Sequence, residues 1–425
     1  MRLGPQLVPA EKQRLFFGWY VVAVAFLANF VSIGTAIYAM NAFMEPLCGT
    51  YGWSRTDVNL AMVWGTLFGF LGQFVYGSLL GRFPIRNFML GGALTAGLVV
   101  TLLTHASVLW QFYLLYILLY IANGAYGGIV ANTVVNNWFR NKRGRALGIA
   151  TSGISLSGVL LPMAAMLLTL RWGMHRAAFC LGVAIAAVGV VAWLIVRDWP
   201  EAYGLQPDGE TKSSGHPTAS DREDGKNDTK RVFWNLSRLS KTPAFWQTGI
   251  AFALIMVGAM GVMSQLKPRF VDIGFNDLTA MALLSAAALV GTVGKYVWGM
   301  WCDRFGPGRV AVILAAANGL GLLPALLNNS RYAVALFVVG YGFAMGGTMA
   351  VYPTLVADLF GRRSFPKVYR FMALFMILQM SGYLIAGRSY DLTGSYNLAY
   401  KLFIVLDCIA VGLLIGVRQP RPSIL

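Results

Sequence analysis

The sequence has few charged residues, few histidines and few cysteines for its length. Only 12% of its 425 residues are charged, and the three histidines, His105, His175 and His216, lie far apart. No histidine stands in a pattern typical of a catalytic triad or a metal site. The four cysteines are also scattered and show neither metal-ligand nor disulfide spacing. We therefore expect no enzyme activity, no metal and no cofactor.

Hydrophobic residues are correspondingly abundant. They make up 57% of the chain, and the mean hydropathy is +0.61. A soluble domain does not need so much apolar surface, whereas about 20 apolar residues cross a bilayer as a helix. The sequence contains about twelve such runs, so we predict an all-α membrane protein. The predicted helices cover residues 17–45, 58–80, 87–105, 108–136, 146–170, 175–197, 244–266, 279–302, 308–328, 332–356, 369–389 and 396–417.

The basic residues lie mainly on one side of these helices. If both termini are cytoplasmic, 25 of the 34 Lys and Arg residues fall in cytoplasmic segments and eight fall outside. This positive-inside bias predicts cytoplasmic termini in a multi-pass protein of the bacterial inner (plasma) membrane. Because the basic residues occupy short loops, we expect membrane lipid and no nucleic acid as a partner.

One polar segment interrupts the apolar pattern. Residues 198–242 are rich in Gly, Ser, Asp and Lys, which is typical of a flexible linker. The linker divides the chain into an N-terminal bundle, residues 1–197, and a C-terminal bundle, residues 243–425, each of about six helices. Similar turns follow the second and eighth predicted helices, with the sequences GSLLGRFPIR (77–86) and GMWCDRFGPGR (299–309). Matching turns at equivalent places indicate an internal repeat.

These turns resemble the loop motif G-x-x-x-D-R-x-G-R-R of the major facilitator superfamily. The second copy matches it at Gly299, Asp303, Arg304, Gly306 and Arg309, whereas Gly81 replaces the acidic residue in the first copy. The resemblance implies the major facilitator fold, with two pseudo-symmetric six-helix bundles. It also implies that the acidic residue latches the two halves, a role that Gly81 cannot fill.

Other motifs resemble the monocarboxylate transporter and oxalate–formate antiporter branch of this superfamily. They are FGWYVV (17–22), YGWSR (51–55), WFRNKRGRALG (138–148), YGLQPDG (203–209), TPAFW (242–246) and the segment 346–361. The resemblance implies a secondary carrier, a monomer, that moves a small organic anion by alternating access, with proton symport or anion exchange. In the branch an arginine three residues before a Trp-Gly pair holds the substrate carboxylate. Here that position is Lys295.

Lys295 is the only charged residue between Leu278 and Cys302, a stretch long enough to cross a bilayer. A cation in hydrocarbon costs several kcal/mol unless it faces a cavity, which indicates a use for this one. Its ammonium group offers three donors for a carboxylate. Because burial favours a neutral lysine and a bound anion favours a charged one, Lys295 is also a candidate for proton coupling. The alternative is a lysine that snorkels toward Asp303 at the membrane edge.

Polar residues on other helices are further candidates for the substrate site. Tyr116, Tyr120, Asn123 and Gly127 share one face of the fourth predicted helix. With Lys295, the substrate-binding candidates are Asn123, Tyr120, Asn29, Gln379, Tyr383 and Tyr341. For each of them, hydrogen bonding between helices is the alternative. Asp407, an acid deep within the last predicted helix, is either a proton carrier or a structural residue.

The charged cytoplasmic loops are candidates for conformational gating. Salt bridges between the halves would hold an outward-facing state, although positive-inside bias alone also explains the cations. The candidates are Asp303, Arg304, Arg309, Arg82, Arg143, Arg145 and Asp358. Two other functions remain open: an exporter of hydrophobic compounds, and a non-transporting sensor that signals through the linker.

Overall fold

The protein is an all-α, multi-pass membrane protein. A computed structural model describes residues 16–53, 55–80, 82–209, 234, 236–327 and 330–419; the middle of the predicted linker and Gly81 lie outside these ranges. Eleven described helices are long and apolar enough to cross a membrane. The longest, α7 (Arg143–Ile195), is broken at Gly173, whose φ of 78° favours glycine, and so contains two spans. The prediction of about twelve membrane-spanning helices is confirmed.

The N-terminal half contains two helices that differ from the prediction. The first span continues from α1 (Gly18–Ile33) through a π-helical turn (Gly34–Tyr38) into α2 (Met40–Tyr51). The fourth span, predicted over 108–136, covers Leu109–Trp138 but is divided into α5 (Leu109–Tyr126) and α6 (Gly128–Trp138). Gly127 is extended there and Gly128 has a φ of 50°, a conformation that glycine adopts at little cost. The other helices of this half are α3 (Arg55–Leu79), α4 (Ile85–Leu103) and α7.

The C-terminal half repeats this pattern of long spans. The eleventh span of the chain is interrupted by a 3-10 turn (Met376–Met380) between α14 (Phe365–Phe375) and α15 (Ser381–Thr393). The remaining helices are α9 (Leu236–Ser240), α10 (Pro243–Asp272), α11 (Asp277–Phe305), α12 (Pro307–Leu327), α13 (Arg331–Phe360) and α16 (Asn397–Ile415). Two short 3-10 turns, Pro200–Tyr203 and Pro207–Gly209, follow α7.

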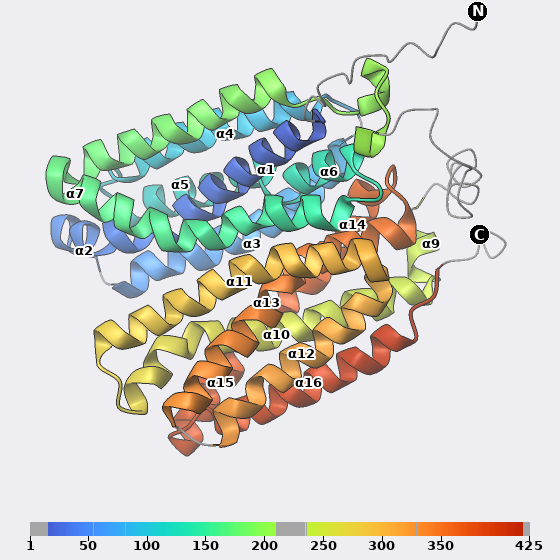
Figure 1. Cartoon of the computed structure of the whole chain (residues 1–425). Coiled ribbons are helices and arrows are strands. Elements are labelled where there is room, and N and C mark those ends of the chain that lie inside the picture. The colour runs from blue at the N-terminus through green and yellow to red at the C-terminus, as the bar shows by residue number, and fades with distance from the viewer. Residues whose placement is uncertain are drawn as a thin grey trace, which may run out of the picture.

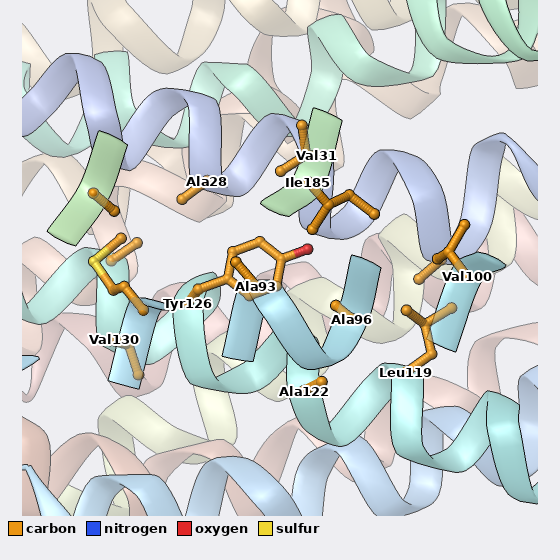
Figure 2. Packing of buried hydrophobic residues seen from close by; sticks show 14 of the residues in the cluster. Ala28, Val31, Ala93, Ala96, Val100, Leu119, Ala122, Tyr126, Val130 and Ile185 are labelled. Atoms are coloured by element: carbon orange, nitrogen blue, oxygen red, sulfur yellow. The ribbon is translucent and has the colours of Figure 1, made fainter. Parts of the chain in front are cut away.

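The helices form two groups that lie side by side, blue to green and yellow to red in Figure 1. The buried core of the first group draws on residues between Val21 and Val196, and two further core clusters draw on residues from Trp234 onward. Figure 2 shows the first core, where small side chains such as Ala28, Ala93 and Ala96 meet Tyr126. Small residues let membrane helices approach closely, so packing contacts hold each bundle together.

The two bundles meet most closely along α7 and α11. A Cβ atom on Gly144 would overlap the backbone oxygen of Gly299, and a Cβ on Gly299 would overlap that of Gly144. Only glycine at both positions allows this approach. The contact between Gly144 and Gly299 lies at the end of the molecule where α1 begins and α16 ends. The loops 80–84, 139–142 and 361–364 lie at the same end, which we call the terminal end. In this structure the bundles are therefore joined at the terminal end.

Candidate functional site

Lys295 lies at the interface between the two bundles. It is on α11, ten residues or about 15 Å from the terminal end of that helix, and its side chain is only 3% exposed. Its Nζ donates hydrogen bonds to the Thr151 backbone oxygen at 3.1 Å and to the Ser155 Oγ at 2.8 Å, both on α7. The side chain therefore points into the other bundle and does not snorkel to the membrane edge beside Asp303.

The face of α7 that receives Lys295 consists of small residues. Gly144, Gly148, Thr151 and Ser155 recur at helical spacing along one side. A Cβ on Gly148 would overlap the backbone oxygen of Lys295, so this glycine also lets α11 approach. Sequence reasoning missed Thr151 and Ser155. The small-residue periodicity is the signal that could have found them, because such faces are typical of helix contacts in membranes.

Asn29 holds three helices together behind this face. Its Nδ2 donates to the Ala150 backbone oxygen on α7 at 3.0 Å, and its Oδ1 accepts from the Gly128 N–H at 3.1 Å. The second bond satisfies a backbone donor at the break between α5 and α6. Both amide atoms are occupied and the residue is 1% exposed, so hydrogen bonding between helices describes Asn29 in this structure.

Asn123 is also bonded within the N-terminal bundle. Its Nδ2 donates to the Ser32 backbone oxygen at 3.0 Å, and its Oδ1 accepts from the Tyr126 hydroxyl at 2.7 Å. One turn before Tyr120 on the same helix, the Tyr116 hydroxyl donates to the Ala36 backbone oxygen. These contacts fix the first and fourth spans against each other.

Three further candidates are Tyr120 of α5, Gln379 of the 3-10 turn and Tyr383 of α15. Tyr120 has a side-chain hydrogen bond with Thr66 of α3 in its own bundle, and it lies within electrostatic range of Tyr383 of the other half. The Tyr383 hydroxyl donates to the Met260 Sδ at 3.3 Å. Gln379, one turn before Tyr383, is half-buried, and its amide has no hydrogen-bond partner in the described part of the chain. Of the three, only the Gln379 amide is without a hydrogen-bond partner among the described residues; a ligand would have to replace Thr66 and Met260 as partners of Tyr120 and Tyr383.

Tyr341 and Asp407 lie together inside the C-terminal bundle and away from Lys295. The two side chains interact electrostatically, and both are 3% exposed. Asp407 is on α16, whose main contacts are with α10, α12 and α15 of the same bundle. Within the described ranges, its Oδ1 has no hydrogen-bond partner. The structure therefore does not bring these two candidates to the interface.

Asp303 joins the bundles at the terminal end. Its carboxylate accepts hydrogen bonds from the backbone N–H groups of Gly144, at 2.6 Å, and Arg145, at 3.0 Å, in the first turn of α7. The Arg145 side chain adds an ion pair, with Nε 3.4 Å from Oδ2. A carboxylate at a helix N-terminus satisfies unpaired N–H groups and lies at the positive end of the helix dipole. Asp303 thus caps a helix of the opposite bundle.

The segment that follows α7 takes part in a second connection between the two halves at the terminal end. The Asp208 carboxylate accepts from the N–H groups of Arg140, Asn141 and Lys142, at 2.9, 2.7 and 3.0 Å, just before α7. Arg362, between α13 and α14, donates to the Asn137 backbone oxygen at 3.0 Å and pairs with Glu201. Its guanidinium also lies 5.2 Å from the centre of the Trp199 ring. Sequence reasoning missed these residues.

The other gating candidates are less involved in this interface. Arg143 is buried, and its Nε lies 3.4 Å from the backbone oxygen of Phe139 in its own bundle. Arg304 is exposed and lies over the Phe305 ring. Arg82 and Arg309 are exposed and form no ion pair among the residues that the structure describes. Asp358 is exposed but has an interaction partner.

A model of the Major Facilitator Superfamily matches residues 19–387 and 250–424. Among curated relatives, the membrane sensor protein UhpC of Salmonella typhimurium is 25% identical over 70% of this chain and 69% of its own. The oxalate:formate antiporter of Oxalobacter formigenes is 24% identical over 83% of this chain and 80% of its own.

Solved structures show the same fold. The human organic anion transporter MFSD10 superposes with a TM-score of 0.70 at 15% identity, over 93% of this chain and 99% of its own. At that identity the likeness establishes the architecture alone.

Proposed function

The chain belongs to the Major Facilitator Superfamily, and from this premise we propose that it is a secondary active transporter of a small organic anion of the monocarboxylate type. One relative is named an oxalate:formate antiporter, and proteins that resemble the chain in structure are named as a transporter and a symporter. We also propose that the termini are cytoplasmic, that the membrane is a bacterial inner membrane and that the carrier is a monomer.

The buried charge of Lys295 carries the proposal. Its two hydrogen-bond acceptors, Thr151 and Ser155, are neutral, and in the described part of the chain no carboxylate forms an ion pair with it. Removing an ammonium group from water without an opposite charge is costly. A carboxylate bound between the bundles would supply that charge through a charge-assisted hydrogen bond. Tyr120, Gln379 and Tyr383 would supply neutral donors to the same ligand.

The contacts of the terminal end support alternating access. We propose that the structure is closed toward the cytoplasm by the Asp303 cap and by the Lys295 bonds to α7. The N-terminal and C-terminal bundles, residues 1–197 and 243–425, would rock about the site between them. Opening of the terminal end would separate α7 from α11 and would take Thr151 and Ser155 away from the ammonium group.

Without these two oxygens, a charged Lys295 in the empty carrier would have no partner. The empty carrier would therefore not change from one orientation to the other while Lys295 is charged. Either a bound anion accompanies each reorientation, which gives anion exchange, or Lys295 loses its proton first, which gives proton symport. Asp407 is the weaker candidate for proton coupling, because it lies inside one bundle. If that bundle moves as a rigid body, the access of Asp407 to the two sides of the membrane does not change.

A sensor is the second candidate function, because two relatives are named as membrane sensor proteins. An exporter of hydrophobic compounds remains the third, and it would not require the charge of Lys295. Uptake of labelled formate, oxalate and lactate into proteoliposomes distinguishes the three. A carrier moves at least one of these anions. A sensor moves none and loses its output when the 198–242 linker is deleted, whereas an exporter moves apolar compounds and is indifferent to Lys295→Ala.

A further inference from the structure

A groove of about 500 Å³ opens on the surface of the N-terminal bundle, between α3, α4 and α5. It lies where α3 and α4 both pack along α5 but make few contacts with each other. Its floor and walls include Tyr76 and Leu79 of α3, Phe88 and Gly91 of α4, and Ile121 of α5. The surface around the groove carries exposed Leu94, Leu98, Leu114 and Leu118. Exposed leucines on a membrane helix face lipid.

Glycine at position 91 keeps the groove open. A Cβ atom added there would meet no atom within 4 Å, so the space beside Gly91 is empty. The adjacent Gly92 is different, because its Cβ would overlap Ala125 of α5. Gly92 therefore allows α4 and α5 to pack, whereas Gly91 leaves a hollow on the lipid side.

The groove begins at the terminal end and runs into the membrane. From Asn87, close to the start of α4, to Thr95, it extends over eight residues, or about 12 Å. One leaflet of a bilayer has a hydrocarbon depth of about 15 Å. The groove therefore has the length and the apolar lining that suit the upper part of an acyl chain in one leaflet.

An exposed cation is next in the chain to Phe83, which lines the groove at its terminal end. Arg82 stands in the loop between the lining residues Leu79 and Phe83, is exposed and has no side-chain partner in the described ranges. Its neighbour Arg86 is different, because it lies over the Trp193 ring and beside the Asp198 carboxylate. Arg82 thus leaves a positive charge where a lipid headgroup would lie above the groove.

We propose that this groove binds one anionic phospholipid, with an acyl chain between α3 and α4 and the headgroup phosphate on Arg82. Charge and shape identify the ligand: the lining accepts a hydrocarbon chain, and the mouth offers a cation and the amide of Asn87. This assigns Arg82 to lipid binding and not to the gate, because it forms no ion pair with the C-terminal bundle in this structure. The site is independent of the transported substrate.

Native mass spectrometry of the purified full chain tests the proposal. The dissociation constant of the first bound lipid is measured for phosphatidylglycerol and for phosphatidylcholine with the same acyl chains. We expect phosphatidylglycerol to bind about fivefold more tightly, since one basic residue near a membrane surface contributes about this factor. Arg82→Gln should remove the preference, because it weakens the binding of net-anionic phosphatidylglycerol more than that of phosphatidylcholine, whose choline already offsets the phosphate charge.

Variants that fill the groove test whether it holds an acyl chain. Gly91→Leu, and Thr95→Phe as a second variant, should weaken the first binding of both lipids at least fivefold. Gly412→Leu is the matched control, because Gly412 is also exposed and has open space around it, on α16. Equal wild-type affinity for the two lipids overturns the proposal, as does a preference that survives Arg82→Gln. It also fails if folded Gly91→Leu and Thr95→Phe both bind like Gly412→Leu.

Discussion

The Nζ of Lys295 donates a hydrogen bond to the Oγ of Ser155 at 2.8 Å, across the interface between the two bundles. The same ammonium group donates to the Thr151 backbone oxygen. One residue proposed to hold the substrate therefore also contributes to closing the terminal end. This connection gives a physical reason why ligand binding and bundle movement would depend on each other, because a carboxylate and the α7 oxygens compete for the same donors.

Removing the Ser155 hydroxyl should favour opening of the terminal end. A hydrogen bond to a charged donor contributes more than about 1 kcal/mol, so Ser155→Ala should raise the open population at least fivefold. The distance between spin labels on Lys142 and Arg304, which are exposed on opposite bundles, measures this population. Ser157→Ala is a control, because its Oγ bonds within α7 to the Ile154 oxygen. An unchanged distance distribution in Ser155→Ala would contradict the role of this bond in closure.

Asp303→Asn should also loosen the terminal end. The amide removes the negative charge that caps α7 and pairs with Arg145, and hydrogen bonds to charged groups contribute about 1.5–3 kcal/mol. Cys302 is a native reporter, because it is 2% exposed and its Cβ packs against Gly144. In a variant that keeps only this cysteine, we expect maleimide labelling to become about tenfold faster. Asp391→Asn, an exposed acid at the opposite end, should leave the rate unchanged.

Gly299→Ala should prevent full closure at the same place. The added Cβ would overlap the backbone of Gly144, and overpacking of this kind costs about 1–3 kcal/mol. Transport should fall at least tenfold, and Cys302 should label faster. Gly308→Ala is the matched control, because nothing lies within 4 Å of its added Cβ. If both alanine variants transported equally well, the close approach of α7 and α11 would not be needed for the cycle.

Asn29 and Gln379 should behave in opposite ways. Asn29→Ala leaves the Gly128 N–H without its acceptor, which costs about 1–3 kcal/mol, so its melting temperature should fall by several degrees while the KM of transport is kept. Gln379→Ala breaks no described hydrogen bond, so its melting temperature should stay and its KM should rise. A raised KM with unchanged stability in Asn29→Ala would instead place Asn29 in the substrate site.

The sequence was sufficient for the architecture and for the position of one candidate site residue. Hydropathy alone predicts the twelve spans, and a single lysine in an apolar run identifies Lys295 without any knowledge of its neighbours. The partners of that lysine could not be predicted from the sequence, because Thr151 and Ser155 lie about 140 positions away on a helix of the other bundle. Hydrogen bonding between distant helices is a tertiary property, which also explains why Asp208 and Arg362 were missed.

Asn123 and Tyr341 illustrate a second limit. Both were selected as polar side chains on predicted helices, but the sequence does not say which way a side chain points. In the structure Asn123 is bonded to Ser32 and Tyr126, and Tyr341 faces Asp407. The break between α5 and α6 was not predicted, although two consecutive glycines, which weaken a helix, occur at that point.

Uptake of labelled carboxylates into proteoliposomes, compared between the wild type, Lys295→Arg, Lys295→Ala and Lys401→Ala, tests the central claim most directly. Lys401 is an exposed lysine on α16 and serves as the control. We predict that the wild type and Lys401→Ala accumulate at least one small carboxylate, that Lys295→Arg retains part of this transport, and that Lys295→Ala loses ten- to a hundredfold. Equal transport by Lys295→Ala, or no carboxylate transport by the wild type, would contradict an anion carrier that binds its substrate at Lys295.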